Sequence, residues 1–148
     1  MNCAQNKIIY TSLASGDLEL WQMKPDGSGK KQLTKREGYD GGAVFSRDGK
    51  KIVWRATDPN NAKAMARYKE LLKENLTEPM KMELFIVGTP MTERRSSSSR
   101  NSAAPRSRPT FTPDGKQIIF SSNKHNCDGR RFELYRINTR RVRAATDH

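Results

Sequence analysis

The sequence contains few of the residues that build catalytic and metal centres. Its 148 residues include two histidines and two cysteines. His125 and Cys127 form one isolated pair, whereas a structural zinc site takes four ligands. The sequence has no Gly-x-Ser-x-Gly nucleophile elbow and no glycine-rich phosphate loop followed by lysine. We therefore predict a chain without catalytic residues, without a bound metal and without a cofactor.

Long hydrophobic runs are also missing. No stretch approaches the ~20 apolar residues of a membrane span, and the first residues lack the apolar core of a signal peptide. Taken as it stands, such a chain would remain in the cytoplasm. Hydrophobic residues make up 34% of the sequence. Even with glycine added, the fraction stays below the ~45–50% usual for globular domains, which predicts marginal stability.

Acidic residues are scarce in the second part of the chain. The net charge is +12, and residues 91–148 carry 13 basic against 5 acidic residues. The densest run, Arg94–Arg108, holds five arginines, six serines and no acid. Such a run binds phosphate backbones without sequence specificity, or stays a solvated loop. Because no aromatic residues are interleaved for base stacking, we predict a disordered loop over 91–108 and do not expect a nucleic-acid partner. A basic nucleic-acid-associated protein remains an alternative.

What the sequence does contain is an internal repeat. An aromatic residue, an Asp-Gly-Lys turn and an apolar strand follow one another twice, in residues 45–54 and 111–120. A motif that begins with Glu, Leu and an aromatic or large apolar residue occurs three times, in Glu19–Met23, Glu83–Val87 and Glu133–Ile137. Asp-Gly between strand-like runs predicts a tight turn, because glycine adopts the positive φ that the turn requires. The predicted turn residues are Asp26, Gly27, Asp48, Gly49, Asp114 and Gly115.

The spacing of the repeats indicates the fold class. Ile8, Ile52 and Ile118 lie in equivalent strands, 44 and 66 residues apart (52 − 8 and 118 − 52), and the longer interval contains a helix-like insert. A period of ~40–50 residues with four short strands is typical of a propeller blade. A small β-sandwich also has regularly spaced strands, but it does not require one motif to recur in register. We predict an all-β chain, a partial β-propeller of about three four-stranded blades, some incomplete, with one helical insert.

The predicted blades fall into two parts around the insert. Residues 1–57 form the first part, residues 58–80 the helical insert, and residues 81–148 the second part. Apolar residues follow each other near helical spacing in the insert. They are Met65, Tyr68, Leu72 and Leu76. The insert either decorates the rim of the propeller and contacts a partner, or packs on its own blade.

These motifs resemble the TolB-type β-propeller repeat, a relative of the WD-type repeat. The resemblance lies in residues 18–34, 38–56 and 109–123, and continues into 132–138. It implies a non-enzymatic, protein-binding propeller associated with the bacterial envelope, in the periplasm or outside the cell. Related propellers also precede the catalytic domain of prolyl-oligopeptidase-type hydrolases, which is a second alternative.

The repeat is interrupted twice. After Val87 and again after Asn138, the expected Asp-Gly turn is replaced by arginine-rich sequence, in residues 88–108 and 139–146. We interpret each interruption as a local reading-frame change or as degeneration of the repeat, which the nucleotide sequence would decide. Three blades of an open ring leave sheet edges exposed. We therefore expect a fragment of a longer propeller, or self-association through the open blade edges.

One loop is not explained by turn geometry. Residues 39–42 would lead into an innermost strand, near the central channel in which propellers often bind ligands. Asp40, Asp48 and Asp114 resemble an acidic cluster, but the last two are accounted for by Asp-Gly turns. We predict that the contact surface for a protein partner consists of Tyr39, Asp40, Gly41 and Gly42.

Overall fold

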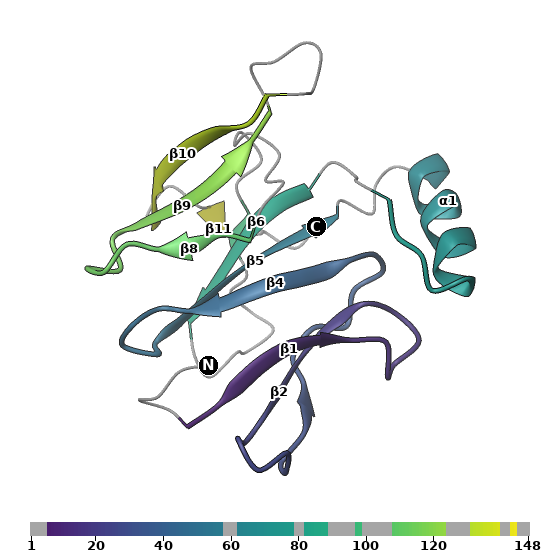
Figure 1. Ribbon diagram of the computed structural model, residues 1–148, viewed down its shortest axis with the longest axis horizontal. Coiled ribbons are helices and arrows are strands. Elements are labelled where there is room, and N and C mark those ends of the chain that lie inside the picture. Colours follow the sequence, from purple (N-terminus) through teal and green to yellow (C-terminus); the bar gives the residue numbers. More distant parts are fainter. Residues whose placement is uncertain are drawn as a thin grey trace.

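The described part of the chain folds into three antiparallel sheets and one helix (Figure 1). The computed structural model describes residues 6–57, 62–78, 82–88, 97–98, 108–123, 131–139 and 143–144. The strands are rich in β-branched and aromatic residues, which favour pleated, half-buried positions. The predicted all-β class with one helical insert is confirmed. Because the sheets carry the repeated motifs in chain order, we call them blades 1, 2 and 3.

Blades 1 and 3 each contain three strands in sequential order. Blade 1 has the order β1-β2-β3, with β1 at Ile8–Ser12, β2 at Glu19–Met23 and β3 at Lys31–Gln32. Blade 3 has the order β10-β9-β8, with β8 at Thr110–Phe111, β9 at Gln117–Ser122 and β10 at Glu133–Asn138. Neighbours in the sequence are therefore neighbours in each sheet, as in a propeller blade.

Blade 2 is a five-stranded sheet with the order β11-β7-β6-β5-β4. Its strands are β4 at Asp40–Phe45, β5 at Lys51–Thr57, β6 at Met82–Gly88, β7 at Ser97–Ser98 and β11 at Arg143–Ala144. Strands β5 and β6 pair along their whole length, so the sequence segments 1–57 and 81–148 meet in one sheet. Strand β11 joins blade 2 through β7 rather than extending blade 3.

The Asp-Gly turns share one set of hydrogen bonds. In blades 2 and 3 a serine or threonine hydroxyl donates to the aspartate carboxylate at 2.6 Å, and a lysine N–H donates to it at 3.0 Å. These bonds, the hydroxyl bond above all, hold the pKa of both carboxyl groups below the ordinary value. Gly49 and Gly115 have φ of 69° and 66°, which costs little only for glycine. In blade 1 the N–H of Ser28 donates to the Asp26 carboxylate at 2.9 Å and Gly27 has a φ of 83°. All six predicted residues therefore lie in tight turns, namely Asp26, Gly27, Asp48, Gly49, Asp114 and Gly115.

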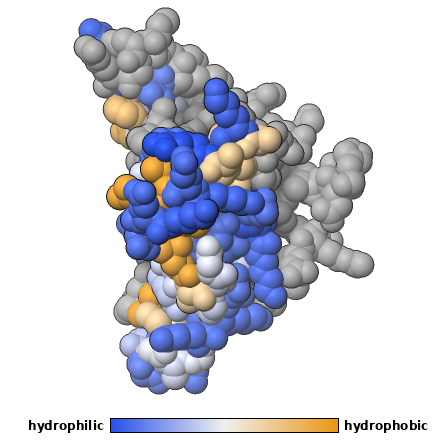
Figure 2. All heavy atoms as spheres, turned by 90° about the vertical axis from the view of Figure 1, so that its right-hand side faces the viewer, coloured by the Kyte–Doolittle hydropathy of each residue, from blue (hydrophilic) through white to orange (hydrophobic). Residues whose placement is uncertain are grey.

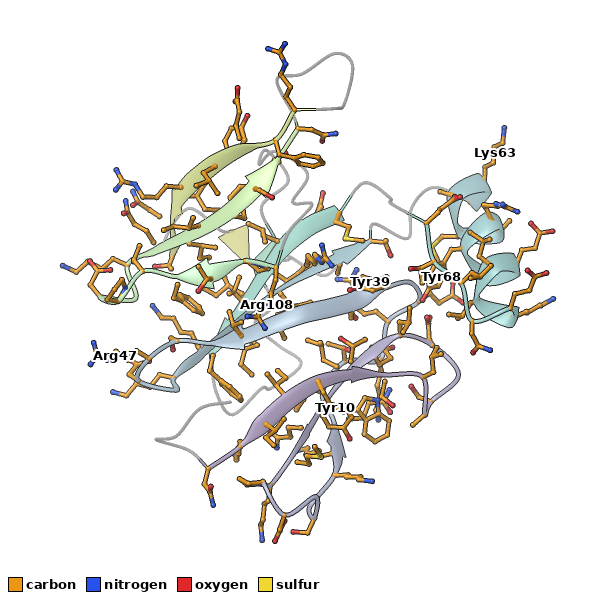
Figure 3. All side chains as sticks on the ribbon, in the orientation of Figure 1. Tyr10, Tyr39, Arg47, Lys63, Tyr68 and Arg108 are labelled. Carbon is orange, nitrogen blue, oxygen red and sulfur yellow. The ribbon has the colours of Figure 1, made fainter. Side chains whose placement is uncertain are left out.

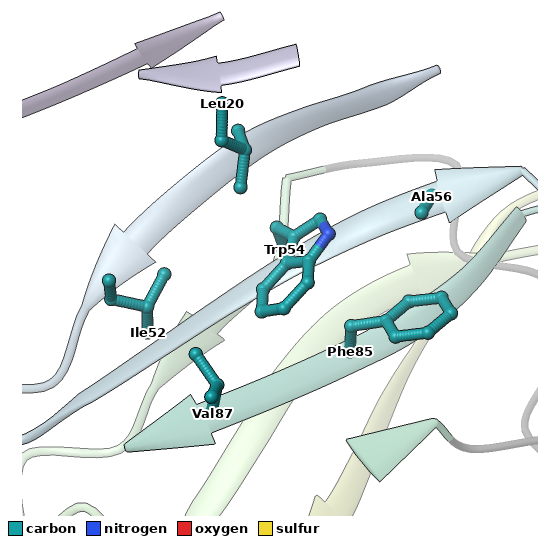
Figure 4. Packing of buried hydrophobic residues seen from close by; sticks show 6 residues of the cluster. All are labelled: Leu20, Ile52, Trp54, Ala56, Phe85 and Val87. Carbon is teal, nitrogen blue, oxygen red and sulfur yellow. The ribbon is translucent and has the colours of Figure 1, made fainter. Parts of the chain in front are cut away.

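Blades 1 and 2 share the first of two hydrophobic cores. Leu20 of β2 packs with Ile52 and Trp54 of β5 and with Phe85 and Val87 of β6 (Figure 4). The rings of Trp54 and Phe85 stack with their centroids 5.5 Å apart. Large aromatic side chains bury much apolar surface, so this core contributes strongly to holding the two blades together.

Blades 2 and 3 share the second core. Val53, Leu84 and Ile86 present the other face of blade 2 to Ile118 and Phe120 of β9. Alternate residues of β5 and β6 thus point to opposite faces of blade 2, as the two-residue period of a strand requires. Because both faces are covered, these two strands contain nearly continuous hydrophobic runs in the sequence.

The insert forms helix α1, Ala62–Lys73, which lies beside the strands at one side of the molecule (Figure 1). Met65 and Tyr68 are buried, whereas Leu76 lies beyond the end of the helix and is exposed. The Tyr68 hydroxyl donates to Asp17 in the loop between β1 and β2, so α1 packs against blade 1. Figure 2 looks onto this side, where hydrophilic residues cover much of the coloured surface.

The contact between Tyr68 and Asp17 should decide whether α1 stays docked. Tyr68→Phe removes the hydroxyl and keeps the ring, so a charged hydrogen bond of about 1.5–3 kcal/mol is lost. We expect faster amide hydrogen exchange in α1 and little change in the sheets. In the control, Arg67→Gln, an exposed ion pair with Glu70 is removed, and exposed pairs contribute little. Equal exchange rates in the two variants would contradict the prediction.

Most of the predicted disordered loop lies outside the described residues. Of residues 91–108, the structure describes only Ser97–Ser98, as β7, and Arg108. The predicted disorder of this loop therefore stays a prediction.

Candidate functional site

The predicted contact loop begins where the chain leaves Gly38. This glycine has a φ of 106°, and a side chain there would collide with the Thr57 hydroxyl, so only glycine fits. The N–H of Tyr39 donates to the same hydroxyl at 2.9 Å. The N–H of Asp40 donates to the carbonyl oxygen of Leu18 at 2.7 Å. These bonds fix the start of β4 between blade 1 and the end of β5.

Asp40 points into the protein. It is 1% exposed, and its Oδ1 accepts a 2.9 Å hydrogen bond from the indole N–H of Trp54. Its Oδ2 has no hydrogen-bond partner among the described residues. Glu19 is also buried and accepts a hydrogen bond from the Thr34 hydroxyl. We call these residues, with Arg36, the carboxyl cluster.

The carboxyl cluster changes the titration of Asp40. Burial raises the pKa of this carboxyl group to about 7, and the negative charge of Glu19 acts in the same direction. The positive charge of Arg36 and the hydrogen bond from Trp54 lower it. Burial dominates, because a carboxylate removed from water loses hydration that a single indole N–H does not replace. The carboxyl group of Asp40 therefore keeps its proton up to a higher pH than an exposed aspartate does.

Arg36 is held beside the cluster by two other contacts. Its Nη2 donates to the carbonyl oxygen of Thr57 at 3.0 Å. Its guanidinium carbon lies 4.3 Å from the centre of the Phe85 ring, within cation–π distance. Arg36 thus supplies a positive charge near Asp40 while its hydrogen bond goes to the end of β5.

A second group of residues lies beside the same loop. The register of β4 against β5 shifts after Gly41, and Gly42 has a φ of 66°. A Cβ atom at Gly42 would lie 3.3 Å from Nε of Arg55 and 3.4 Å from Cγ of Arg108. Arg55 donates from Nη2 to the Tyr39 hydroxyl at 3.4 Å, with its guanidinium 5.6 Å from the ring centre. We call Tyr39, Gly42, Arg55 and Arg108 the arginine–tyrosine surface.

The arginine–tyrosine surface can bind an acidic ligand. In Figure 3 Tyr39 lies near the start of β4, and Arg47 lies beyond the other end of the strand. Arg108 is exposed, and Tyr39, Gly42 and Arg55 are half-buried. A guanidinium group binds a carboxylate through two parallel hydrogen bonds. Two such groups beside a phenol ring therefore suit a carboxylate on an apolar stem.

The structure separates the four predicted contact residues into two pairs. Asp40 and Gly41 are buried, whereas Tyr39 and Gly42 are half-buried and reach the surface. Gly41 has a packing role, because a Cβ atom there would collide with the Tyr39 hydroxyl. The part of the predicted loop that a partner could touch is thus Tyr39 and Gly42.

Sequence reasoning missed Arg55, Arg108 and Glu19. Arg55 interrupts the apolar run of β5 and pairs with Gly41, and a charge within a buried strand is a usable signal. Arg108 belongs to the arginine-rich run, and Glu19 belongs to a repeated strand motif. Neither of these two residues therefore stands out in the sequence.

No described group of three or more histidine, cysteine, aspartate or glutamate side chains could hold a metal ion. Both histidines and both cysteines, His125, His148, Cys3 and Cys127, lie outside the described residues. Among the described helical residues, no helix is long and apolar enough to cross a membrane. The predictions of no metal, no cofactor and no catalytic residue stay predictions.

Solved structures resemble this chain over nearly its whole length. A TolB candidate from Agrobacterium tumefaciens matches 95% of the chain at a TM-score of 0.64 and 14% identity. TolB from Acinetobacter baumannii matches 94% of the chain at a TM-score of 0.63 and 20% identity. The chain has a TolB-like β-propeller fold. The predicted partial propeller is confirmed, and the β-sandwich alternative is wrong.

The TolB-like chain spans only part of the proteins it matches. It covers 44% and 28% of the two TolB chains. An oligogalacturonate lyase in complex with manganese matches 85% of this chain and 28% of its own, at a TM-score of 0.51 and 12% identity. Dipeptidyl-peptidase 5 of Porphyromonas endodontalis is 36% identical over 59 residues, 38% of this chain and 8% of that protein. No family model matches the chain.

Proposed function

We propose that this TolB-like chain is part of a non-enzymatic propeller that binds another protein through the arginine–tyrosine surface. The observation that carries the proposal is the convergence of Arg55 and Arg108 on Gly42, beside Tyr39. Tyrosine and arginine, together with tryptophan, are enriched among the residues that dominate binding energy at protein interfaces. Strand β4 is an edge strand of blade 2, and the absence of a side chain at Gly42 lets Arg55 and Arg108 approach this edge closely.

The partner that fits this surface is an acidic segment of a protein. Its carboxylates would bind the two guanidinium groups, and its apolar stems would pack along the Tyr39 ring. The net charge of +12 would favour the encounter with such a partner. Binding should therefore weaken with increasing salt.

We place this function in the bacterial envelope, in the periplasm or outside the cell. Two proteins with similar folds, a TolB candidate and a TolB, come from bacteria. Because the chain covers less than half of either TolB chain, we propose that the rest of the propeller comes from further sequence or from another chain.

Photo-crosslinking tests the proposed contact surface. A benzophenone amino acid in place of Tyr39 should form a saturable crosslink to one protein of the source bacterium's envelope fraction. Arg108→Glu should reduce this crosslink at least about tenfold, since it reverses a charge that the partner binds. The matched control carries the same photoreactive residue at Arg47, which is exposed beyond the other end of β4. Equal yields at both positions, or no effect of Arg108→Glu, would refute the proposal.

The hydrolase alternative receives little support. The match to dipeptidyl-peptidase 5 covers 8% of that protein, too small a part to carry its activity over to this chain. The described residues include no histidine, so a Ser-His-Asp triad cannot be assembled from them.

A further inference from the structure

The internal repeat places one leucine at the same position in each blade. Leu20, Leu84 and Leu134 each follow the glutamate of the repeated strand motif. Leu20 and Leu84 are 0% exposed, whereas Leu134 is 80% exposed. Because the residue type and the position in the repeat are the same, the difference arises from what covers each leucine.

Each buried leucine is covered by the blade that follows it. The covering residues of Leu84 are Ile118, Phe120, Tyr135 and Ile137 of blade 3. The covering residues of Leu20 are Ile52, Trp54, Phe85 and Val87 of blade 2. In both cases two residues come from each of two paired strands. Among the described residues, blade 3 has no such cover, and its Phe132 is also exposed, by 56%.

Blade 1 carries the matching cover at the other end of the chain. At the positions in the repeat that hold the covering residues of blades 2 and 3, blade 1 has Ile8, Tyr10, Trp21 and Met23. Tyr10 pairs with Trp21 and Ile8 pairs with Met23, so the four side chains share one face. Strand alternation turns this face away from Leu20 and from blade 2; Figure 3 marks Tyr10 on it. The indole N–H of Trp21 is buried and has no hydrogen-bond partner in the described part of the chain.

We propose that these two faces dock in trans, so that blade 1 of one copy covers Leu134 on blade 3 of a second copy. The chain itself argues for a second copy, because it carries both halves of an interface that it already forms twice internally. The contact joins two different faces, head to tail, and such contacts close into rings when the rotation allows. This contact uses neither Tyr39 nor Arg108, so it stands or falls independently of the proposed function.

Two copies are the expected size of the ring. One copy covers 44% of the TolB candidate from Agrobacterium tumefaciens and 28% of TolB from Acinetobacter baumannii. Two copies together therefore come close to the full length of the first of these chains. Closure would also cover the exposed apolar side chains of blade 3, which favours association. Strands β1 and β10 are edge strands of their sheets, and ring closure protects blade edges from aggregation.

The mass of the purified 148-residue chain tests this inference. Light scattering and sedimentation should give twice the 16.8 kDa of one chain. Leu134→Asp should weaken association at least about 100-fold, because it places a carboxylate in an apolar interface. Leu134 is exposed in a single copy, so this variant should keep its fold by circular dichroism. The control is Leu76→Asp, at another exposed leucine, and it should keep the mass of two chains.

Mixing two variants tests the head-to-tail geometry. Tyr10→Asp alters the blade 1 face and should also yield single chains. A mixture of Tyr10→Asp and Leu134→Asp retains one intact contact and should recover the mass of two chains. A symmetrical contact between two blade 3 faces would instead leave Tyr10→Asp paired, which would overturn the inference.

Two further results would overturn the inference. One is the mass of a single chain for the unaltered protein, which is expected if further blades of a longer chain cover these faces. The other is a dimer whose stability does not change in Leu134→Asp.

Discussion

Replacing Leu84 with alanine is expected to lower the free energy of unfolding by about 2–5 kcal/mol, whereas the same change at Leu134 should lower it by less than about 0.5 kcal/mol. The two leucines hold the same position in the repeat, but Leu84 is 0% exposed and Leu134 is 80% exposed. Truncation leaves a cavity between blades 2 and 3 only at Leu84. The surrounding side chains fill such a cavity incompletely, which adds to the lost transfer free energy.

Urea unfolding followed by tryptophan fluorescence measures both effects, because Trp54 is buried in the folded chain. The chain concentration must be low enough that a second copy does not cover Leu134. At higher concentration Leu134→Ala should become destabilising, since the association that we propose would then bury this leucine. Equal losses for the two variants at low concentration would show that the blades do not pack as described.

Replacing Asp40 with asparagine is expected to remove a loss of stability that the unaltered chain undergoes as the pH rises. The pKa of Asp40 is about 7 in the folded chain, above the ~3.9 of an unfolded aspartate. A raised pKa contributes stability that is fully present below about pH 4 and is lost as the pH rises through about 7. Between pH 5 and 7 the free energy of unfolding should fall by on the order of 2 kcal/mol from this group alone.

Asparagine is the suitable replacement because it has nearly the shape of aspartate. Its oxygen can still accept the hydrogen bond from Trp54, and its amide takes the place of the unpartnered Oδ2. Urea unfolding at several pH values from about 5 to 8 should show a flatter profile for Asp40→Asn and a gain in stability at the upper end. In the control, Asp48→Asn, the altered carboxyl group is exposed and has a lowered pKa, so the pH dependence should persist. An unchanged profile in Asp40→Asn would mean that Asp40 does not titrate in this range.

The candidate site could be located from the sequence, but its composition could not. The loop at Tyr39–Gly42 stands out because its two glycines are not required by an Asp-Gly turn. The Asp40 side chain points inward because it accepts a hydrogen bond from Trp54, which is 14 residues away in the chain. Arg108 lies beside Gly42 because blade 3 packs next to β4. Both contacts join residues that no local sequence pattern relates.

The sequence by itself determined the all-β class, the repeated blades and the Asp-Gly turns. These features follow from local chemistry, because a two-residue period and a positive φ at glycine depend on neighbouring residues alone. Only the tertiary structure decided that Asp40 is buried while Asp48 is exposed, that β11 pairs with β7, and that Leu134 lacks the cover of Leu84. Burial and charge interactions are set by whichever blade lies alongside, and the same residue in the same motif therefore has different neighbours in each blade.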